Sequence, residues 1–134
     1  MTNVRDFMTA NPITVAANAS VADLVALMRQ TAVNHVPVLA DEMQVVGIIS
    51  RDDLQFALSP ACEGNAGAPL PSLDSLMTPS LLTVKPTDSI YRVVELMSLF
   101  LPRALVVMAD NKLVGLVTAR SLLDYLSGAQ PRLV

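Results

Sequence analysis

Apolar residues recur along this chain in a helical pattern that occurs once in each half. Valine, leucine and methionine fall at helical spacing over residues 21–28 and again over residues 90–97, which predicts two amphipathic helices. Ser20, with Asp23 three residues later, has the pattern of a capping box, and Ser89 stands where the second helix should begin. Both helices are therefore predicted from local chemistry.

Runs rich in β-branched residues follow each of these helices. Turn-forming residues divide each run into two, which predicts a β-hairpin in each half. A short extended piece precedes each helix, and a second helix closes each half. These elements are expected at residues 13–15, 35–39, 44–50 and 52–58 in the first half, and at residues 82–84, 104–109, 112–118 and 121–126 in the second. Each half is thus a βαββα unit.

The two halves also repeat each other in sequence. Residues 7–9 (Phe-Met-Thr) return 69 positions later as Leu-Met-Thr, and residues 46–50 (Val-Gly-Ile-Ile-Ser) return 68 positions later as Val-Gly-Leu-Val-Thr. Ordered matches of this kind indicate an internal duplication. The segment between the copies holds three of the nine prolines and two of the five glycines, which is typical of a linker or surface loop. We predict a first repeat over residues 1–58, a linker over residues 59–72 and a second repeat over residues 73–134.

The predicted strands are apolar at nearly every position, so both faces of each sheet need to be covered. The helices of one repeat can cover only one face, and a half of about 60 residues buries only about 60% of its unfolded surface. We therefore predict an α+β fold in which the two repeats pack sheet to sheet about a pseudo-twofold axis, with clefts between them.

Composition and charge exclude several classes of protein. Of the 134 residues 52% are hydrophobic and 16% charged, too apolar a composition for a disordered chain. The net charge is −3 and the nine Lys and Arg are scattered, so nucleic acid is not an expected partner. No apolar run approaches the length of about 18 residues that crosses a bilayer, so no membrane partner is expected. A single cysteine, Cys62, and the lack of a secretory pattern at the N-terminus favour the cytoplasm.

Candidate chemistry gathers where the last strand of the first repeat meets its closing helix. The hydroxyl of Ser50, the cation of Arg51 and the N–H groups of a helix start are the components of a phosphate site. Asp53 could accept two hydrogen bonds from a ribose diol. In the alternative interpretation, which is the more common one for an isolated junction, Ser50 or Asp52 only caps the helix and Asp53 favours its dipole.

Nothing in the sequence indicates catalysis or a metal site. His35 is the only histidine, and the adjacent Asp52 and Asp53 lie about 100° apart on a helix, so they do not form a facing pair of carboxylates. No serine, cysteine or lysine has a plausible base partner, and no glycine-rich phosphate loop occurs. We predict that the chain is not an enzyme and requires no cofactor.

The Met-Thr loop of each repeat, the segment His35-Val36-Pro37-Val38 and the Gly-hydrophobic-hydrophobic-Ser/Thr-x-x-Asp ending together resemble a tandem pair of cystathionine-β-synthase (CBS) domains, a Bateman module. The resemblance covers about residues 4–58 and 73–127. It implies a regulatory module without catalysis, in which clefts between the repeats bind adenosine compounds. These are AMP, ADP or ATP, and in some relatives S-adenosylmethionine or a nicotinamide dinucleotide.

The resemblance also implies roles for single residues. Ser50 would bind a phosphate, Asp53 would bind the ribose hydroxyls, and a basic residue of the other repeat, Arg103, would reach the phosphates. Residues near the first two strands would flank the adenine. The full predicted set is Ile13, Thr14, Val15, Val36, Pro37, Ser50, Arg51, Asp53 and Arg103.

The second repeat departs from this pattern, because Ser121 stands where the ribose-binding aspartate is expected. A hydroxyl cannot replace the two acceptor atoms of a carboxylate, so we predict a second cleft that is weaker or empty. Its residues would be Thr83, Val84, Thr118, Arg120, Ser121 and, as the counterpart of Arg103, His35.

The aliphatic surplus of the outer helices predicts an assembly. Residues 21–28, 56–58, 90–100 and 122–126 offer more apolar surface than one small module can bury, so we expect a homodimer through these helices. We predict a nucleotide sensor that signals to a separate, unidentified protein. One alternative is a ligand-free dimerisation or docking module. The other is a regulatory piece of a larger enzyme or transporter, although Met1 close to the first repeat and a short tail favour a stand-alone chain.

Overall fold

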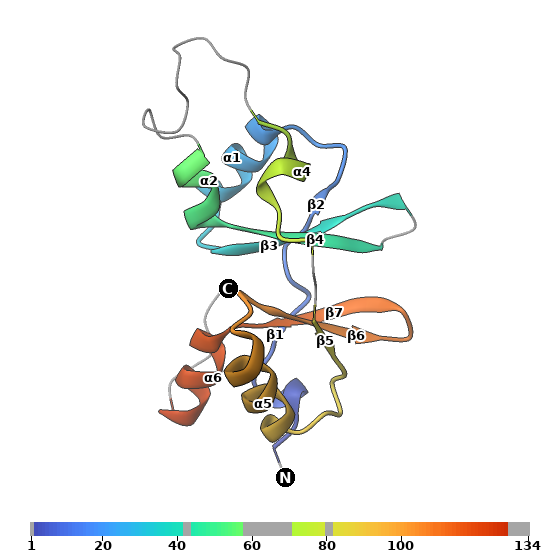
Figure 1. Ribbon diagram of the computed structural model, residues 1–134, viewed down its shortest axis with the longest axis vertical. Coiled ribbons are helices and arrows are strands. Elements are labelled where there is room, and N and C mark those ends of the chain that lie inside the picture. Colours follow the sequence, from blue (N-terminus) through green and yellow to red (C-terminus); the bar gives the residue numbers. More distant parts are fainter. Residues whose placement is uncertain (1, 42–43, 58–70, 80–81, 129–134) are drawn as a thin grey trace. The chain divides into compact units, whose positions relative to one another are not determined.

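A computed structural model describes residues 2–41, 44–57, 71–79 and 82–128 (Figure 1). The chain forms two compact units. Unit 1 comprises Met1–Pro12 and Ser80–Val134, and unit 2 comprises Ile13–Pro79. Each unit has its own β-sheet and helices, which confirms the predicted α+β class.

Unit 2 contains a three-stranded sheet in the order β2-β3-β4, with β2 parallel and β4 antiparallel to the central strand. Figure 1 shows α1, α2 and α4 on the same face of this sheet. The elements are β2 (Val15–Ala16), α1 (Val21–Gln30), β3 (His35–Leu39), β4 (Val45–Ser50), α2 (Arg51–Ala57) and α4 (Leu73–Leu76). The apolar stripe of α1, formed by Val21, Leu24 and Met28, is buried against Val36 and Ile49 of the sheet.

Unit 1 contains a four-stranded sheet in the order β1-β7-β6-β5, with α5 and α6 on one face (Figure 1). The elements are η1 (Val4–Asp6), β1 (Thr9–Ala10), β5 (Thr83–Val84), α5 (Ile90–Phe100), β6 (Leu105–Ala109), β7 (Lys112–Val117) and α6 (Ala119–Leu126). The core combines residues from both ends of the chain, because Val4 and Phe7 pack with Val93, Leu105 and Val117.

The sequence repeats and the compact units divide the chain differently. The Met-Thr segment of the first repeat belongs to unit 1, where Thr9 pairs with Leu116 of β7. The Met-Thr segment of the second repeat belongs to unit 2, where Thr78 and Ile48 exchange two backbone hydrogen bonds of 2.8 and 3.2 Å. The Met-Thr segment of the first repeat therefore adds to the sheet of unit 1, which is built mainly from the second repeat. The Met-Thr segment of the second repeat adds to the sheet of unit 2, which is built mainly from the first.

Two glycines make room for the methionines of these segments. A Cβ atom at Gly47 would lie 2.5 Å from the sulfur of Met77, and one at Gly115 would collide with the sulfur of Met8. Neither glycine has a left-handed backbone conformation. Glycine is therefore required at both positions because the methionine side chain packs directly against the strand.

The predicted strands and helices are confirmed over the part of the chain that the structure describes. The capping box of α1 is present, with Asp23 N–H donating to Ser20 Oγ at 3.0 Å and Ser20 N–H donating to Asp23 Oδ2 at 3.3 Å. The short elements η1, β1 and α4 were not predicted, and α6 begins two residues before the expected position. Residues 58–70, which include Cys62 and most of the predicted linker, lie outside the described residues.

No helix within the described ranges is long and apolar enough to cross a membrane.

Candidate functional site

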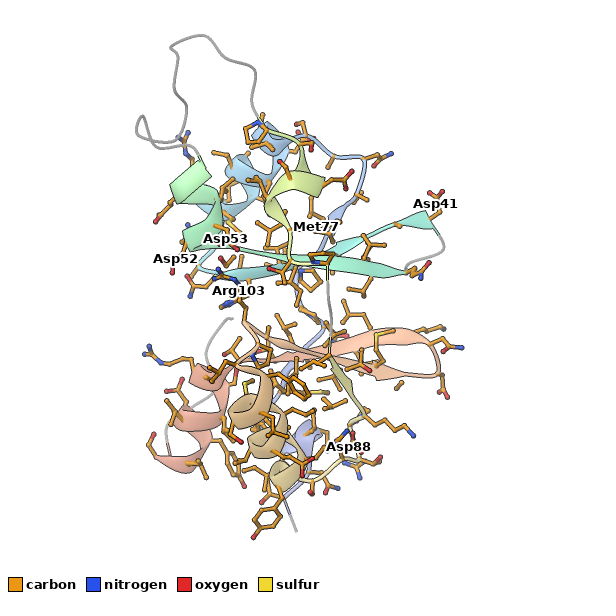
Figure 2. All side chains as sticks on the ribbon, viewed as in Figure 1. Asp41, Asp52, Asp53, Met77, Asp88 and Arg103 are labelled. Carbon is orange, nitrogen blue, oxygen red and sulfur yellow. The ribbon has the colours of Figure 1, made fainter. Side chains whose placement is uncertain are left out.

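The junction of β4 and α2 brings Ser50 and Asp53 together. Ser50 is the last residue of β4 and is buried, and its Oγ accepts the backbone N–H of Asp53 at 3.0 Å. Figure 2 shows Asp52 and Asp53 at one end of the β3–β4 ladder, far from Asp41 at the hairpin turn. The hydroxyl of Ser50 thus caps α2, as the alternative interpretation proposes. A hydroxyl also has a proton and a second lone pair, so capping is compatible with donation to a phosphate oxygen.

The residues predicted to flank adenine lie at the same end of this sheet, where β3 begins and β4 ends. In the β3–β4 ladder His35 pairs with Ser50, Val36 with Ile49 and Pro37 with Ile48. Because β2 runs parallel to β3, Ile13 and Thr14, which directly precede β2, lie at the end of the sheet where β3 begins and β4 ends. Unit 2 alone therefore collects eight of the nine predicted ligand-binding residues, all except Arg103.

Arg51 is engaged with backbone carbonyl groups of its own unit. Its Nη2 donates to the carbonyl oxygens of Met28 at 2.8 Å, Thr31 at 3.2 Å and Val33 at 2.7 Å, and its Nε donates to Val33 at 3.1 Å. Its backbone N–H donates to the carbonyl of Asn34 at 2.7 Å. The sequence could not reveal this role, because it depends on the packing of α2 beside the end of α1.

Arg103 is exposed in unit 1, two residues before β6. The ladder registers correct the equivalence that we drew between Arg103 and His35. His35 pairs with Ser50, and the pairing of Leu105 with Val117 places Ala104 at the matching position, opposite Thr118. The predicted equivalence was wrong by one residue, because the deletion between the repeats lies in the hairpin turn. That Arg103 contacts phosphates stays a prediction.

The corresponding junction in unit 1 is a closed capping box. The Oγ1 of Thr118 accepts the N–H of Ser121 at 3.1 Å, the N–H of Thr118 donates to Ser121 Oγ at 3.3 Å, and the two hydroxyl groups lie 3.0 Å apart. Both residues are buried. Arg120 points its Nε at Asp124 Oδ1, 3.3 Å away. The two hydroxyl groups at this junction therefore bind each other and the backbone N–H of the opposite residue.

The other residues predicted for the second cleft lie in unit 1, except for His35. Thr83 and Val84 line a hollow of about 480 Å³ in unit 1, together with Lys85, Asp88, Arg92, Met108, Asp110 and Asn111. This lining includes neither Thr118 nor Ser121, and His35 belongs to unit 2. In the β5–β6 ladder Val84 pairs with Val107, the register in which Val15 pairs with Val38 in unit 2. Unit 1 therefore places Thr83 and Val84 relative to Thr118 as unit 2 places Thr14 and Val15 relative to Ser50.

Among the residues that the structure describes, no group of three or more His, Cys, Asp and Glu side chains could hold a metal ion. The chemistry of the β4–α2 junction is that of hydrogen bonding, with one hydroxyl and one carboxylate beside an apolar strand edge. Such a set suits a ligand that combines an apolar ring with hydroxyl groups.

Comparisons with known proteins place these features in a family. The model of the CBS domain matches residues 4–60 and 73–128. Homoserine O-acetyltransferase of Methanosphaera stadtmanae is 30% identical over 116 residues, which cover 86% of this chain but only 22% of that protein. The chain thus spans about a fifth of the length of this curated relative.

Two solved structures resemble the chain over nearly its whole length. The CBS domain pair of protein MJ0100, in complex with 5′-methylthioadenosine and S-adenosyl-L-methionine, has a TM-score of 0.80 at 24% identity and covers 96% of this chain and 98% of that one. CBSX2, in complex with AMP, has a TM-score of 0.74 at 29% identity, with the same coverage of both chains.

Proposed function

This chain belongs to the CBS domain family, and from that premise we propose that it is a regulatory module that binds an adenosine nucleotide of the AMP, ADP and ATP class and signals to a partner protein. The observation that carries the proposal is the junction of β4 and α2. There a buried hydroxyl, Ser50, and a carboxylate, Asp53, stand beside the apolar start of β3.

Each part of the ligand has a group in unit 2 that suits it. Two hydroxyl groups of a ribose can donate to the two oxygens of the Asp53 carboxylate, and charge-assisted hydrogen bonds of this kind are strong. The O–H of Ser50 can donate to a phosphate oxygen. Val36, whose side chain is buried beneath α1, and the buried Pro37 form the apolar start of β3 beside this junction. CBSX2, 29% identical to this chain, was solved with AMP, which supports the same ligand class here.

Signalling requires that the nucleotide bind two states of the module with different affinity. We propose that the regulated activity belongs to another protein or domain, because the chain contains only CBS repeats within the matched residues. The relatives named homoserine O-acetyltransferase are much longer than this chain. We therefore propose that the protein or domain regulated by this module is an enzyme.

A thermal-shift panel with AMP, ADP, ATP, S-adenosylmethionine and NADH tests the proposal. A ligand at about 100 times its dissociation constant should stabilise the wild type by roughly 2.7 kcal/mol. Asp53→Ala should lose most of this shift. Asp52→Ala is the matched control, since Asp52 is the neighbouring carboxylate, is exposed and lies about 100° around α2 from Asp53. A panel without any shift in the wild type would contradict the proposal.

A dimerisation role has separate support in the surface of unit 1. The large hydrophobic side chains that are exposed in the described ranges all lie in α5, in the residue after it and in α6: Tyr91, Val94, Leu99, Phe100, Leu101, Leu123, Tyr125 and Leu126. In α1, by contrast, Val21, Leu24 and Met28 are buried in the core of unit 2, and Val25 and Leu27 are partly buried against it. We therefore propose that two copies of the chain pair through α5 and α6. The side chains of residues 56–58, which the sequence analysis also named for this pairing, lie outside the described residues.

Sedimentation velocity at micromolar concentration tests this pairing. Wild type should sediment as a dimer, and the double variant Leu123→Glu with Leu126→Glu should sediment as a monomer. Ala26→Glu, which places the same charge on an exposed position of α1, should leave the dimer intact. A monomeric wild type would contradict the proposal.

A further inference from the structure

The end of α1 has backbone carbonyl groups that the helix itself cannot pair. The last four carbonyls of any α-helix lack an intrahelical donor. Here Thr31 is the C-cap in an extended conformation, and its Oγ1 donates to the carbonyl of Leu27 at 3.0 Å. The carbonyl of Met28 receives its hydrogen bond from the guanidinium of Arg51, at 2.8 Å.

The same guanidinium holds the segment that leads from α1 into β3. Both Nε and Nη2 of Arg51 donate to the carbonyl of Val33, and the backbone N–H of Arg51 donates to that of Asn34. The next residues along the chain are His35, Val36 and Pro37, at the start of β3. The position of that start is thus linked directly to Arg51.

Arg51 also occupies the first position of α2, next to Ser50 and two residues before Asp53. A single side chain therefore connects the three parts of unit 2 that meet at the proposed site. These are the end of α1, the start of β3 with the apolar residues, and the junction with the hydroxyl and the carboxylate. A positive charge is also favourable at a helix C-terminus, so this connection is stabilised electrostatically as well as by its geometry.

In unit 1 the carbonyl groups at the end of α5 are paired without such a connection. The residue that corresponds to Arg51 is Ala119, whose methyl group cannot donate. The end of α5 is instead closed locally by Leu101 in the left-handed conformation, with φ 46° and its N–H donating to the carbonyl of Met97 at 3.1 Å. The connection from helix end to strand–helix junction is therefore specific to the unit that carries the carboxylate.

We propose that Arg51 is the positioning residue of the adenosine site in unit 2 and does not contact the phosphate. This inference rests on the proposed function. The guanidinium acts through Ser50, Asp53 and the start of β3, by keeping them in the arrangement that the ligand requires. Such preorganisation raises affinity because less ordering is needed on binding.

The affinities of adenosine and AMP distinguish positioning from phosphate binding. Titration calorimetry well below the unfolding temperature should show that Arg51→Ala weakens both ligands by the same factor, about tenfold, as expected for the loss of one charge-assisted interaction. Arg51→Lys should weaken both by a smaller factor, because an ammonium keeps the charge but loses the planar fork. Arg29→Ala, which removes an exposed arginine from α1, should change neither affinity.

Three results would overturn the inference or its basis, each in a different way. A loss of AMP affinity with unchanged adenosine affinity would assign Arg51 to the phosphate. Equal affinities in wild type and Arg51→Ala would remove any role of Arg51 in binding. A wild type that binds neither ligand, and neither ADP nor ATP, would overturn the proposed function itself.

Hydrogen exchange of the ligand-free protein adds a readout that does not depend on affinity. In Arg51→Lys, the variant that best preserves folding, the backbone N–H of residue 51 and the amides at the start of β3 should exchange faster than in wild type, while those of β6 stay unchanged. Unchanged exchange at the start of β3 would contradict the positioning role even if affinity fell.

Discussion

The two units close their last strand with the same local structure and different chemistry. In unit 2 the hydroxyl of Ser50 caps α2 and is followed by the carboxylate of Asp53, whereas in unit 1 Thr118 caps α6 and binds Ser121. Capping needs only a hydroxyl oxygen that accepts a backbone N–H, and both junctions provide it. Binding two ribose hydroxyls needs two acceptor atoms, and only unit 2 provides a carboxylate. The capping role thus persists where the carboxylate that we propose for ribose binding is missing.

The ends of the first helices differ in the same sense. In unit 2 the end of α1 is bound by a side chain from a distant element, Arg51, which connects it to the junction. In unit 1 the end of α5 is closed by the backbone of Leu101 alone. The unit with the candidate site is therefore the one in which a side chain connects the end of the first helix to the strand–helix junction.

The largest effect that we predict concerns a feature that the units share, the glycine beneath a methionine. Gly47→Ala should destabilise the protein by about 1–3 kcal/mol, because the new methyl group would overlap with Met77. In a Met77→Ala background the same change should cost less than half as much. Gly115→Ala with Met8→Ala should give the matching result for unit 1. Denaturant unfolding measures all four combinations, and equal costs in both backgrounds would show that the methionines do not occupy these places.

A smaller effect is expected from converting the junction of unit 1 toward that of unit 2. Ser121→Asp should keep the capping box, since Asp23 fills the same position in the box of α1. It should add a second, weaker AMP site, which we expect to bind at least about tenfold less tightly than the first, because Ala119 stands where Arg51 connects the parts of unit 2. Ser121→Asn, which has nearly the same shape without the charge, is the control. Calorimetry that finds no added site would mean that the carboxylate alone does not make the difference between the units.

The smallest effect distinguishes the two helix ends. Leu101 is 84% exposed and has a positive φ, and the left-handed conformation costs a non-glycine residue roughly 1–2 kcal/mol. In the monomeric Leu123→Glu, Leu126→Glu background, where Leu101 has no partner copy to contact, Leu101→Gly should therefore stabilise the protein by about 0.5–1 kcal/mol after the greater entropy of the unfolded glycine is included. Thr31→Gly, at an extended C-cap, should destabilise it by a similar amount. Opposite signs in thermal unfolding would confirm the comparison, and equal signs would contradict it.

Much of this architecture could be predicted from the sequence, and the reasons are local. The helices of both repeats follow from apolar spacing and from caps such as Ser20 with Asp23, and the hairpins follow from β-branched runs around turn residues. The duplication and the family also followed from short ordered motifs, because these are read directly along the chain. The departure at Ser121 was visible for the same reason.

Two features could not be predicted because they depend on contacts between distant segments. The repeat pattern assigned Phe7 and Met8 to the first repeat, but they complete unit 1, since the pairing of β1 with β7 decides their place. The partners of Arg51 are carbonyl groups that come within reach only when α2 packs beside α1. The sequence after the helices gives no signal that separates the two ends, because neither residues 31–34 nor residues 101–104 contain a glycine.

The central claim, that only unit 2 has a complete adenosine site, is tested most directly by the stoichiometry of AMP binding. Titration calorimetry of the wild type should give one tightly bound AMP per chain. Asp53→Ala should remove that site, and Ser121→Ala should leave it unchanged. Two equally tight sites per chain, or a single site that survives Asp53→Ala, would contradict the account.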